Sequence, residues 1–440
     1  MLLFKIKLIV ITLLIVMLLD IYSWQGIKNL IRHQSQKIKK ITSIFFWSIT
    51  LVTILSLIIN LVFSGINTGP VFRVYSAGFF FLVYLSKLFF CLFLFIEDIY
   101  RLFRWLVYKT FIREAISDST HDLSEQNIEG IELIEKPKNG LHLTRSQFIS
   151  RAALLTTALP FIILTRGITK GAYNYKIRRV QLHLPKLPKA FDGLKILQIS
   201  DIHSGSFTDK DAVNNGIKMI VDEKADIVFF TGDMVNNRSD EFNPWQDLFS
   251  QIKAPMGVFS TLGNHDYGDY VLDWKSPDEK KKNLDDLIKA QSDLGWKLLR
   301  NEHVIIDKKF QNLAILGVEN WGDRGRFQKF GDIDKAKYHM PESTVKLLLS
   351  HDPSHFDSIV SKHHKDIDVT FSGHTHGFQF GFEIGNLKWS PSQYIYPHWA
   401  GLYEVEKQKI YVNRGFGFLG FPGRVGILPE ITVFTLSKEI

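Results

Sequence analysis

Aspartate, asparagine and histidine residues recur in five short blocks in the second half of this 440-residue chain. Their side chains supply the oxygen and nitrogen atoms that bind divalent transition metals. Seven of them are candidate ligands, which is more than one mononuclear ion can use. The blocks are, in chain order, Asp201-Ile202-His203, Gly232-Asp233, Gly263-Asn264-His265-Asp266, an isolated His351, and Gly373-His374-Thr375-His376. Metal-dependent chemistry is therefore expected in this half of the chain.

Each block directly follows a segment with the character of a strand. These segments are short, rich in β-branched and aromatic residues, and bounded by Gly, Asp or Asn. Strands are predicted at Lys195–Ser200, Ile227–Thr231, Val258–Leu262, Asn312–Val318, Lys346–Ser350 and Asp368–Ser372. Helices are predicted between several of them, at Asp209–Glu223, Asp278–Leu294 and His355–His363. The alternation indicates an α/β domain over residues 176–440, with the blocks at the carboxyl ends of strands, where α/β sheets build their sites.

The ordered series of blocks resembles the calcineurin-like metallophosphoesterase family over about residues 190–440. Any one block is weakly specific, whereas all five in this order are highly specific. The resemblance implies a four-layer α/β/β/α sandwich and a hydrolase acting on phosphoester bonds. It also implies two divalent metal ions, and the sequence leaves Mn, Fe, Zn and Ni open.

Individual roles follow from the same resemblance. It assigns Asp233 as the residue that bridges both ions, and His265 as a histidine that stabilises the transition state or protonates the leaving oxygen. Asp266 is then expected to orient His265. The remaining ligands are, for the first ion, Asp201, His203 and His376, and for the second, Asn264, His351 and His374. A structural role is the preferred interpretation for the other histidines of this half, namely His303, His355, His363, His364 and His398.

Two further features lie near the carboxyl end. Arg414, after a predicted strand at Lys409–Val412, and Arg424 are candidate substrate-binding residues that could clamp a phosphate, with a solvated loop arginine as the alternative. Several aromatic residues could face the core, a lipid tail or the bilayer surface, and the core is the favoured interpretation: Phe378, Phe380, Phe382, Trp389, Phe416, Phe418 and Phe421.

The first half of the chain has the pattern of a membrane region. Ile41–Gly65 contains no charge and exceeds the roughly 20 apolar residues that span a bilayer. Ser76–Ile96 is interrupted only by Lys87, for which snorkelling is favoured over contact with a partner helix or a functional role. Met1–Leu19 is interpreted as a retained anchor rather than a signal peptide. We predict a multi-span anchor of about three helices over 1–110, a polar linker over 111–147, and a short membrane or interfacial helix over 148–168. The membrane region shows no polar pair of the kind that a transport path would use.

Charge is divided unevenly between the two halves. Residues 1–180 contain 22 Lys+Arg and 10 Asp+Glu, a net charge of +12, whereas residues 181–440 contain 31 and 35, a net charge of −4. An acidic catalytic domain argues against a nucleic-acid partner. The basic loops predict that the chain crosses the cell membrane several times, with the catalytic domain on the extracytoplasmic face if 148–168 spans and in the cytoplasm if it does not. The single cysteine, Cys91, excludes an intramolecular disulfide framework.

These features together predict a membrane-anchored binuclear phosphoesterase that hydrolyses a phosphodiester, phosphomonoester or pyrophosphate bond. A membrane anchor favours a lipid-linked, phosphate-containing substrate, and membrane lipids are the other expected partner. The alternatives are a pyrophosphatase of the UDP-2,3-diacylglucosamine type, as in lipid A synthesis, and a non-catalytic metal-binding membrane protein.

Overall fold

The computed structural model describes residues 2–62, 70–107, 109, 145–271, 274–325, 327–385 and 387–438. The chain forms two compact units. The helical unit comprises Met1–Val62 and Phe79–Ile163, and the α/β unit comprises Phe63–Gly78 and Leu164–Ile440. Most of the linker predicted over 111–147 lies outside the described residues, so that prediction is untested.

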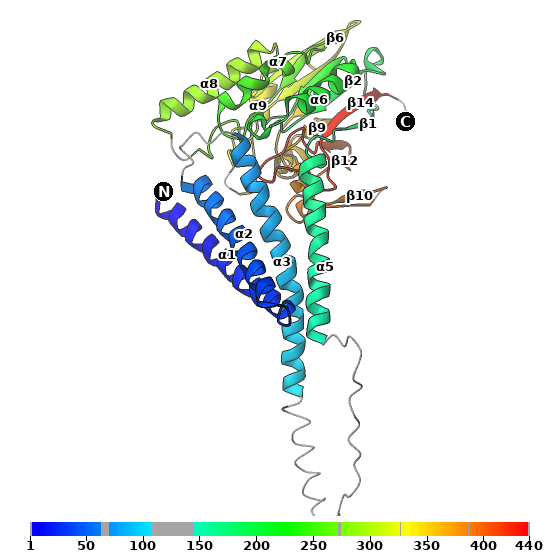
Figure 1. Ribbon diagram of the computed structural model, residues 1–440. Helices are drawn as coiled ribbons and strands as arrows, with labels where there is room; N and C mark the ends of the chain where they lie inside the picture. Colours follow the sequence, from blue (N-terminus) through cyan, green and yellow to red (C-terminus); the bar gives the residue numbers. More distant parts are fainter. Residues whose placement is uncertain are drawn as a thin grey trace, which may run out of the picture. The chain divides into compact units, whose positions relative to one another are not determined.

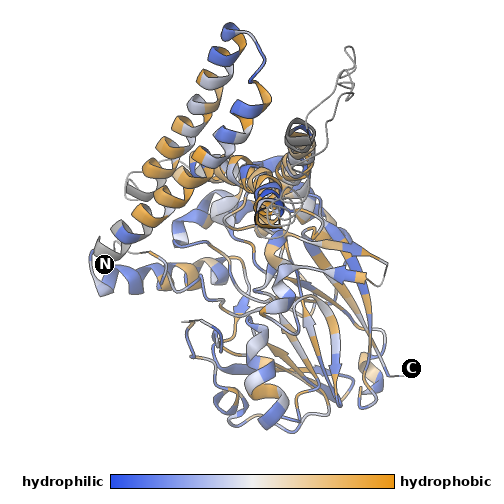
Figure 2. Cartoon of the chain, turned by 90° about the horizontal axis from the view of Figure 1, so that it is seen from below, coloured by the Kyte–Doolittle hydropathy of each residue, from blue (hydrophilic) through white to orange (hydrophobic). Residues whose placement is uncertain are grey.

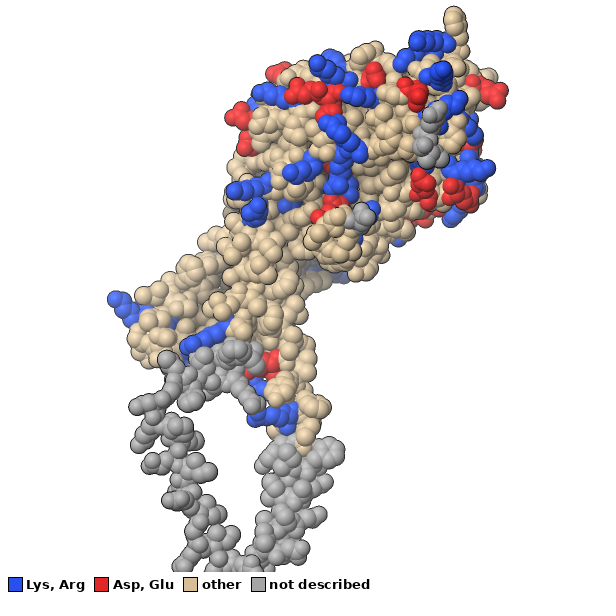
Figure 3. Space-filling view, turned by 90° about the vertical axis from the view of Figure 1, so that its right-hand side faces the viewer, with Lys and Arg blue, Asp and Glu red and all other residues tan. Residues whose placement is uncertain are grey.

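Four long helices carry the apolar sequence of the first half (Figure 1). They are α1 (Leu2–Leu30), α2 (Gln36–Val62), α3 (Pro70–Val107) and α5 (Arg145–Arg166). Stretches of these helices are long and apolar enough to cross a bilayer: Val10–Leu30, Gln36–Ile59, Val71–Val107 and Arg151–Gly171. Figure 2 shows their largely hydrophobic residues, and in Figure 3 the long helices present mostly uncharged surface. Since many of their Leu, Ile and Phe side chains are exposed, these helices require an apolar surrounding, and the chain is a membrane protein.

A buried polar cluster joins three of these helices within the helical unit. Lys87 of α3 forms an ion pair with Asp20 of α1 and donates a hydrogen bond to Thr50 Oγ1 of α2 at 3.0 Å. The hydroxyl of Tyr84 donates to Asp20 Oδ2 at 2.9 Å. The prediction that Lys87 snorkels is therefore wrong, because Lys87 faces two partner helices. An amine in apolar surroundings is stabilised by a carboxylate from another helix, and sequence spacing alone could not reveal that partner.

Two six-stranded sheets form the centre of the α/β unit. The first has the order β1 (Lys176–His183), β14 (Glu430–Ser437), β2 (Lys195–Ile199), β3 (Ile227–Phe230), β4 (Val258–Ser260) and β5 (Lys297–Leu298). The second has the order β12 (Gly401–Val405), β13 (Gln408–Val412), β9 (Val369–Ser372), β8 (Lys346–Leu349), β7 (Gln311–Gly317) and β6 (Glu302–Lys308). Strands β10 (Phe382–Ile384) and β11 (Leu387–Trp389) pair separately as a hairpin. Strands β2 to β5 are parallel, as are β7, β8, β9 and β13, so the carboxyl ends of each set lie at one edge.

Helices cover the outer faces of the two sheets. Those of the first are α6 (Lys210–Asp222), α7 (Gln246–Phe249) and α8 (Pro277–Asp293), and those of the second are α9 (Ile333–Lys337), α10 (Pro353–His355) and α11 (Ser361–His363). Short helical turns are η2 (Gly167–Gly171), η3 (Lys189–Phe191), η4 (Ser204–Ser206), η5 (Ser239–Trp245), η6 (Phe356–Val360), η7 (His376–Gln379) and η8 (Pro391–Tyr394). Helix α6 begins where the Asp209 side chain accepts from Ala212 N, and α8 where the Ser276 side chain accepts from Glu279 N.

Alternating side chains on the strands build three apolar layers. On β3, Ile227 and Phe229 pack between the two sheets, whereas Val228 and Phe230 pack under the helices of the first sheet. On β8, Leu347 packs between the sheets. A third layer lies between the second sheet and its helices, for example at Leu348, Phe356 and Val360. Both faces of each sheet are covered, which explains why these strands are continuous apolar runs. The predicted four-layer α/β/β/α sandwich is confirmed.

The structure contains several elements that were not predicted, and one predicted helix is interrupted. Strands β1 and β14, which pair in parallel over eight residues, were not among the predicted strands. Their pairing joins segments some 250 positions apart, and the sequence of β1, KIRRVQLH, is largely polar with no regular apolar period. The helix predicted at 355–363 is interrupted by the π-turn η6.

Candidate metal centre

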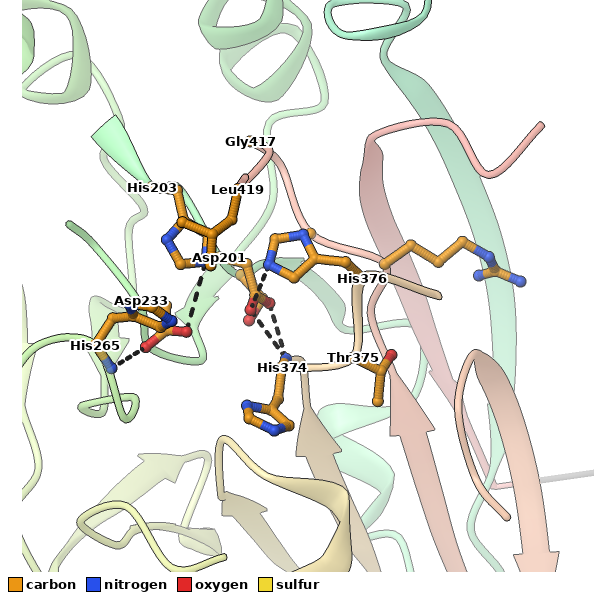
Figure 4. Close-up of polar contacts among 12 residues, drawn as sticks. Asp201, His203, Asp233, His265, His374, Thr375, His376, Gly417 and Leu419 are labelled. Atoms are coloured by element: carbon orange, nitrogen blue, oxygen red, sulfur yellow. Dashed lines mark hydrogen bonds and ion pairs between the residues drawn. The ribbon is translucent and has the colours of Figure 1, made fainter. Parts of the chain in front are cut away.

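Seven buried or nearly buried polar side chains meet where the carboxyl ends of the two sheets come together. Figure 4 labels Asp201, His203, Asp233, His374 and His376 among them. They follow β2 (Asp201 and His203), β3 (Asp233), β4 (Asn264), β8 (His351) and β9 (His374 and His376). The structure thus brings together every residue that sequence analysis proposed as a ligand.

Their ligand atoms form adjoining groups that could hold metal ions. Potential donors of Asp201, His203 and His376, which we call the first group, lie within 4.8 Å of one another. The same holds for Asp233, His351 and His374, which we call the second group. Asp233 also adjoins the first group, because its Oδ2 atom lies 3.5 Å from His203 Nε2 as well as 3.1 Å from His351 Nε2. It therefore lies between the histidines of the two groups. A carboxylate in this position can offer oxygen to ions on both sides.

Asparagine completes the second group. The Oδ1 atom of Asn264 lies 2.8 Å from His374 Nδ1, which is itself 3.2 Å from His351 Nε2. The amide of Asn264 donates to the Tyr270 hydroxyl at 2.7 Å, which directs its Oδ1 toward His374. A neutral amide oxygen and two imidazoles thus point at one position beside Asp233.

Several buried ring nitrogens suit a cation at this place. Both ring nitrogens of His203 and Nε2 of His376 have no hydrogen-bond partner among the described residues, and buried polar atoms rarely go without one. Burial lowers the pKa of His203 well below its ordinary value, which keeps the imidazole neutral, as a metal ligand must be. The donor set therefore fits divalent metal ions.

His351 has the hydrogen bond that orients a metal-binding imidazole. Its Nδ1 donates to the carbonyl oxygen of Thr231 at 2.7 Å, which leaves Nε2 facing Asp233. Burial lowers the pKa of His351, but the Asp233 carboxylate outweighs this and raises it to about 10. The Nε2 atom of His351 therefore lies against the Asp233 carboxylate, where a metal ion held by both residues would bind.

The backbone is held in uncommon conformations at five of the seven residues. Their φ angles are positive: 51° at Asp201, 47° at His203, 61° at Asp233, 71° at His374 and 50° at His376. This left-handed region costs a non-glycine residue about 1 kcal/mol or more. Backbone hydrogen bonds hold it here, since Asp201 N donates to Gly232 O at 2.9 Å and His203 N donates to Asp233 O at 3.1 Å. Such strain is typical of functional sites.

The glycines of the motifs permit close approach of the loops. A Cβ atom on Gly263 would lie 2.2 Å from Asp233 Oδ1, and one on Gly373 would lie 1.9 Å from Ser200 Oγ. Gly232, with φ 93°, would place a Cβ atom 2.5 Å from the nitrogen of Gly263. These positions accept only glycine without displacement of the proposed ligands.

Comparison with known proteins places these residues in a family. The family model described as calcineurin-like phosphoesterase matches residues 194–378, and the one described as probable calcineurin-like phosphoesterase, transmembrane domain, matches residues 6–172. A metallophosphoesterase of Bacillus subtilis, YkuE, is 30% identical over 314 residues, which cover 67% of this chain and 98% of the relative. The chain belongs to the calcineurin-like metallophosphoesterase family. It is a hydrolase acting on phosphoester bonds.

Two other relatives carry more specific names. A zebrafish (Danio rerio) "transmembrane protein with metallophosphoesterase domain" is 25% identical over 294 residues, 66% of this chain. The match spans 63% of that relative's own length. The "UDP-2,3-diacylglucosamine pyrophosphatase LpxG" of Chlamydia muridarum is 27% identical over 277 residues, 55% of this chain and 83% of that relative.

In this metallophosphoesterase His265 lies beside the first group, but Asp266 does not orient it. The carboxylate of Asp266 accepts from three backbone N–H groups, those of Gly263 at 2.8 Å, Asp233 at 2.9 Å and Met234 at 2.8 Å. It therefore ties together the loops that follow β3 and β4. The Nδ1 atom of His265 instead lies 2.6 Å from the carbonyl oxygen of Asn236. The expectation about Asp266 is wrong because its side chain turns inward to satisfy buried backbone donors.

Neither candidate phosphate clamp is available to a substrate. Arg414 is buried and pairs with Glu430 and Glu383. Arg424 is also buried, and its guanidinium donates to the carbonyl oxygens of Arg414, Gly415 and Gly417. These bonds use the donors that a phosphate would need, so the clamp prediction is wrong for both.

Arg424 instead contacts His376, a member of the first group. Its Nη2 lies 3.1 Å from His376 Nδ1, on the side of the ring opposite Nε2. The guanidinium therefore helps to set the orientation of the His376 ring.

Two residues that contact the second group were not foreseen. The Nε2 atom of His374 lies 2.9 Å from the Tyr396 hydroxyl and 3.5 Å from Asp352 Oδ2. Both are placed to orient the His374 ring so that Nδ1 faces His351. Asp352 directly follows His351 in sequence, which was an available signal, whereas nothing local marks Tyr396.

Proposed function

We propose that this protein is a binuclear metallophosphoesterase whose substrate is a phosphate-containing lipid or lipid-linked molecule at the membrane surface. The observation that supports two ions rather than one is the position of Asp233 between two groups of donors. We assign Asp201, His203 and His376 to one ion, and Asn264, His351 and His374 to the other. Manganese, iron, zinc and nickel all suit these nitrogen and oxygen donors.

The residues around these groups determine how such a site works. Two bound divalent cations would polarise the phosphoryl group and lower the pKa of a water molecule that attacks it. His265 reaches the same space, because its ring centroid lies 4.9 Å from that of His203. Its Nδ1 is engaged by the Asn236 carbonyl, so Nε2 is the atom that would donate a proton to the leaving oxygen or a hydrogen bond to the phosphoryl group.

A membrane-borne substrate is supported by two independent facts. The chain carries four apolar helices long enough to span a bilayer, which confine its catalytic domain to the membrane surface. One relative is named as a pyrophosphatase of a diacylated sugar nucleotide. That name favours cleavage of a pyrophosphate bond as a second candidate beside phosphodiester hydrolysis.

We place the catalytic domain on the extracytoplasmic face. This placement is supported by four candidate spans together with the basic residues of 20–40 and 98–151, which favour a topology with the chain beyond α5 outside. Protease added to intact cells should then cleave the catalytic domain, and cleavage only in inverted vesicles would place it in the cytoplasm. The cytoplasmic outcome would favour a nucleotide-linked substrate, because sugar nucleotides are made there.

The function is tested with purified full-length protein and two variants. Asp233→Asn should lose bound metal and hydrolysis of a bis-aryl phosphodiester together. His265→Ala should keep its metal, measured by elemental analysis, and lose about 100-fold or more in kcat. His363→Ala, an exposed histidine at the end of α11, is the matched control and should behave as wild type.

Three outcomes contradict parts of this proposal. Metal stoichiometry of one per chain in the active wild-type protein would exclude the binuclear centre. Full activity in both Asp233→Asn and His265→Ala would move the chemistry elsewhere. Metal binding without turnover of any phosphoester would support the non-catalytic alternative.

A further inference from the structure

A row of exposed apolar side chains begins two residues after His376, at the edge of the proposed metal centre. We call it the apolar rim, and it comprises Phe378, Phe380, Phe382, Ile384, Leu387, Tyr394 and Ile395. The most exposed are Ile384 at 72%, Leu387 at 63% and Tyr394 at 75%. The β10–β11 hairpin carries the centre of the rim, and β10 is labelled in Figure 1. The core interpretation holds for Phe416 and Phe418, which are buried, and is wrong for Phe378, Phe380 and Phe382.

The β10–β11 hairpin exposes apolar side chains and turns charged ones inward, which is the reverse of an ordinary surface hairpin. Phe382 and Ile384 are exposed, while Glu383 between them points inward and pairs with Arg178 and Arg414. On the partner strand Leu387 is exposed, and the next residue, Lys388, donates to the carbonyl oxygen of Ala400 and to Tyr403. Apolar side chains outside and charges inside are favourable only where the outer face meets an apolar medium.

Within the α/β unit, the rim lies next to the segment around Val425, which contacts residues just beyond α5. Phe380 forms a β-bridge with Val425, Gly381 N donates to Val425 O at 2.9 Å, and Val425 N donates to Gln379 O at 2.7 Å. The other side of this segment meets the end of the α5 span, because Arg424 N donates to the carbonyl oxygen of Gly167 at 3.2 Å. Only the segment around Val425 therefore separates the rim from the end of an apolar helix.

A second membrane helix reaches the same segment. Gly78 of α3, which belongs to the α/β unit, packs so closely on Pro422 that a Cβ atom would lie 2.5 Å from its Cγ. The same Cβ atom would lie 3.5 Å from Ile168, just beyond α5. Arg166 and Lys170 at the end of α5 are exposed, and their long side chains can reach the headgroup layer from the end of an apolar helix.

We propose that the apolar rim inserts into the interfacial layer of the bilayer that α5 crosses. Lipid, rather than a protein partner, is the occupant that these contacts favour, since the rim is continuous with a segment bearing the ends of two membrane-spanning helices. Burial of several large apolar side chains in the interfacial layer would hold the tethered domain against the surface.

The rim also places the proposed chemistry at the lipid surface, a consequence that rests on the proposed function. Gly377 alone separates His376 from the first rim residue, Phe378. A phosphoester held by a lipid in the interfacial layer would reach the metal centre without leaving the membrane.

The insertion is tested by site-directed spin labelling of the full-length protein. In a Cys91→Ala background, Ile384→Cys carries a nitroxide label, and Phe310→Cys is the control because Phe310 is fully exposed in the β6–β7 turn, away from the rim in sequence. The protein is reconstituted in vesicles of phosphatidylcholine and phosphatidylglycerol. Compared with the control, the label at 384 should be at least threefold more accessible to oxygen than to an aqueous nickel chelate.

Two results would overturn the insertion. One is equal accessibility of the two labels to the nickel chelate. The other is spin–spin broadening at 384 that disappears on dilution with lipid, which would show that a second copy of the chain covers the rim.

A second variant separates the rim from catalysis. Ile384→Asp with Leu387→Asp should lower the turnover of a vesicle-borne phosphodiester bearing a long alkyl chain by at least tenfold. The same variant should hydrolyse a soluble bis-aryl phosphodiester as wild type does, which also shows that it folds. Equal loss on both substrates, or on neither, contradicts the role of the rim. If wild type hydrolyses neither substrate, the proposed function fails, while the spin-label experiment still decides the insertion.

Discussion

Replacement of Arg414 distinguishes a structural ion pair from a substrate clamp. The guanidinium Nη1 lies 2.5 Å from Glu430 Oε2, and Glu430 is fully buried at the start of β14. Its other carboxylate oxygen, Oε1, accepts from the Tyr411 hydroxyl at 2.6 Å and from Thr432 Oγ1 at 2.5 Å. Arg414→Met would keep most of the side-chain volume and leave the Glu430 carboxylate without its main cation.

The magnitude follows from the contacts that remain. Removal of one partner of a buried ion pair costs about 3–5 kcal/mol. The Nε atom of Arg178 stays 3.2 Å from the same oxygen of Glu430, so we expect the lower end, about 3 kcal/mol. A domain of this size loses about 2–4 °C in Tm per kcal/mol, which predicts a fall of about 6–12 °C.

The pH dependence gives a second signature. In the wild-type protein burial opposes ionisation, but the charges of Arg414 and Arg178 hold the pKa of Glu430 below its ordinary value. This pair therefore stabilises the fold above the unfolded-state pKa of about 4.3, and the stabilisation is lost as the pH falls. Without Arg414 the buried carboxyl has a raised pKa and protonates more readily. The gap in Tm between variant and wild type should therefore narrow from pH 7 to pH 5.

The assay is thermal unfolding of the purified protein, followed by fluorescence, together with kinetics on a soluble phosphodiester. The control is Arg414→Met combined with Glu430→Gln, which removes both charges and should recover most of the lost Tm. An unchanged Tm in Arg414→Met with a KM raised tenfold would refute the structural role and would support Arg414 as a residue that binds the substrate phosphate.

Three further predictions concern the motif glycine, the metal and the membrane cluster. Gly373→Ala should lower metal content without unfolding the domain, because its Cβ would fall 1.9 Å from Ser200 Oγ and 2.3 Å from Asp201 Oδ2; unchanged stoichiometry by elemental analysis would contradict this. Removal of metal by a chelator should abolish hydrolysis and destabilise the fold by about 2.7 kcal/mol relative to metal at 100-fold over its Kd, and re-addition should restore both. Lys87→Met should reduce the thermal stability of the detergent-solubilised protein by about 3 kcal/mol or more, by leaving Asp20 unpaired. Lys87→Met with Asp20→Asn should regain most of that loss, and equal stability of single and double variants would show that the pair is not coupled.

Much of the fold was predictable because local sequence patterns indicate many of its strands and helices. The strands before Asp201, Asp233 and His351 are apolar on both faces, since helices and the opposite sheet cover them, and such runs stand out in sequence. Strand β1 was missed because its sequence, KIRRVQLH, is largely polar with no regular apolar period, and because its partner β14 lies at the other end of the α/β unit.

The sequence predicted which residues meet at the site, but the roles predicted for several of them were wrong. The seven proposed ligands are recognisable because each follows a strand, and parallel strands bring their carboxyl ends to one edge. Asp266, Arg414 and Arg424 were misjudged because residue type indicates what a side chain can bind but not which buried group competes for it. The backbone amides near Asp266 and the carboxylate of Glu430 became neighbours only on folding.

By itself the amino-acid sequence determined that this chain has apolar helices of bilayer length, an α/β domain, and metal-binding residue types in the order of one hydrolase family. Those properties depend on neighbours along the chain. Only the tertiary structure decided that Lys87 pairs with Asp20. It also decided that Arg414 and Arg424 are buried and bonded within the protein, and that the phenylalanines after His376 are exposed. Each of these depends on contacts between segments far apart in the chain, where burial and charge are set by partners that no local pattern names.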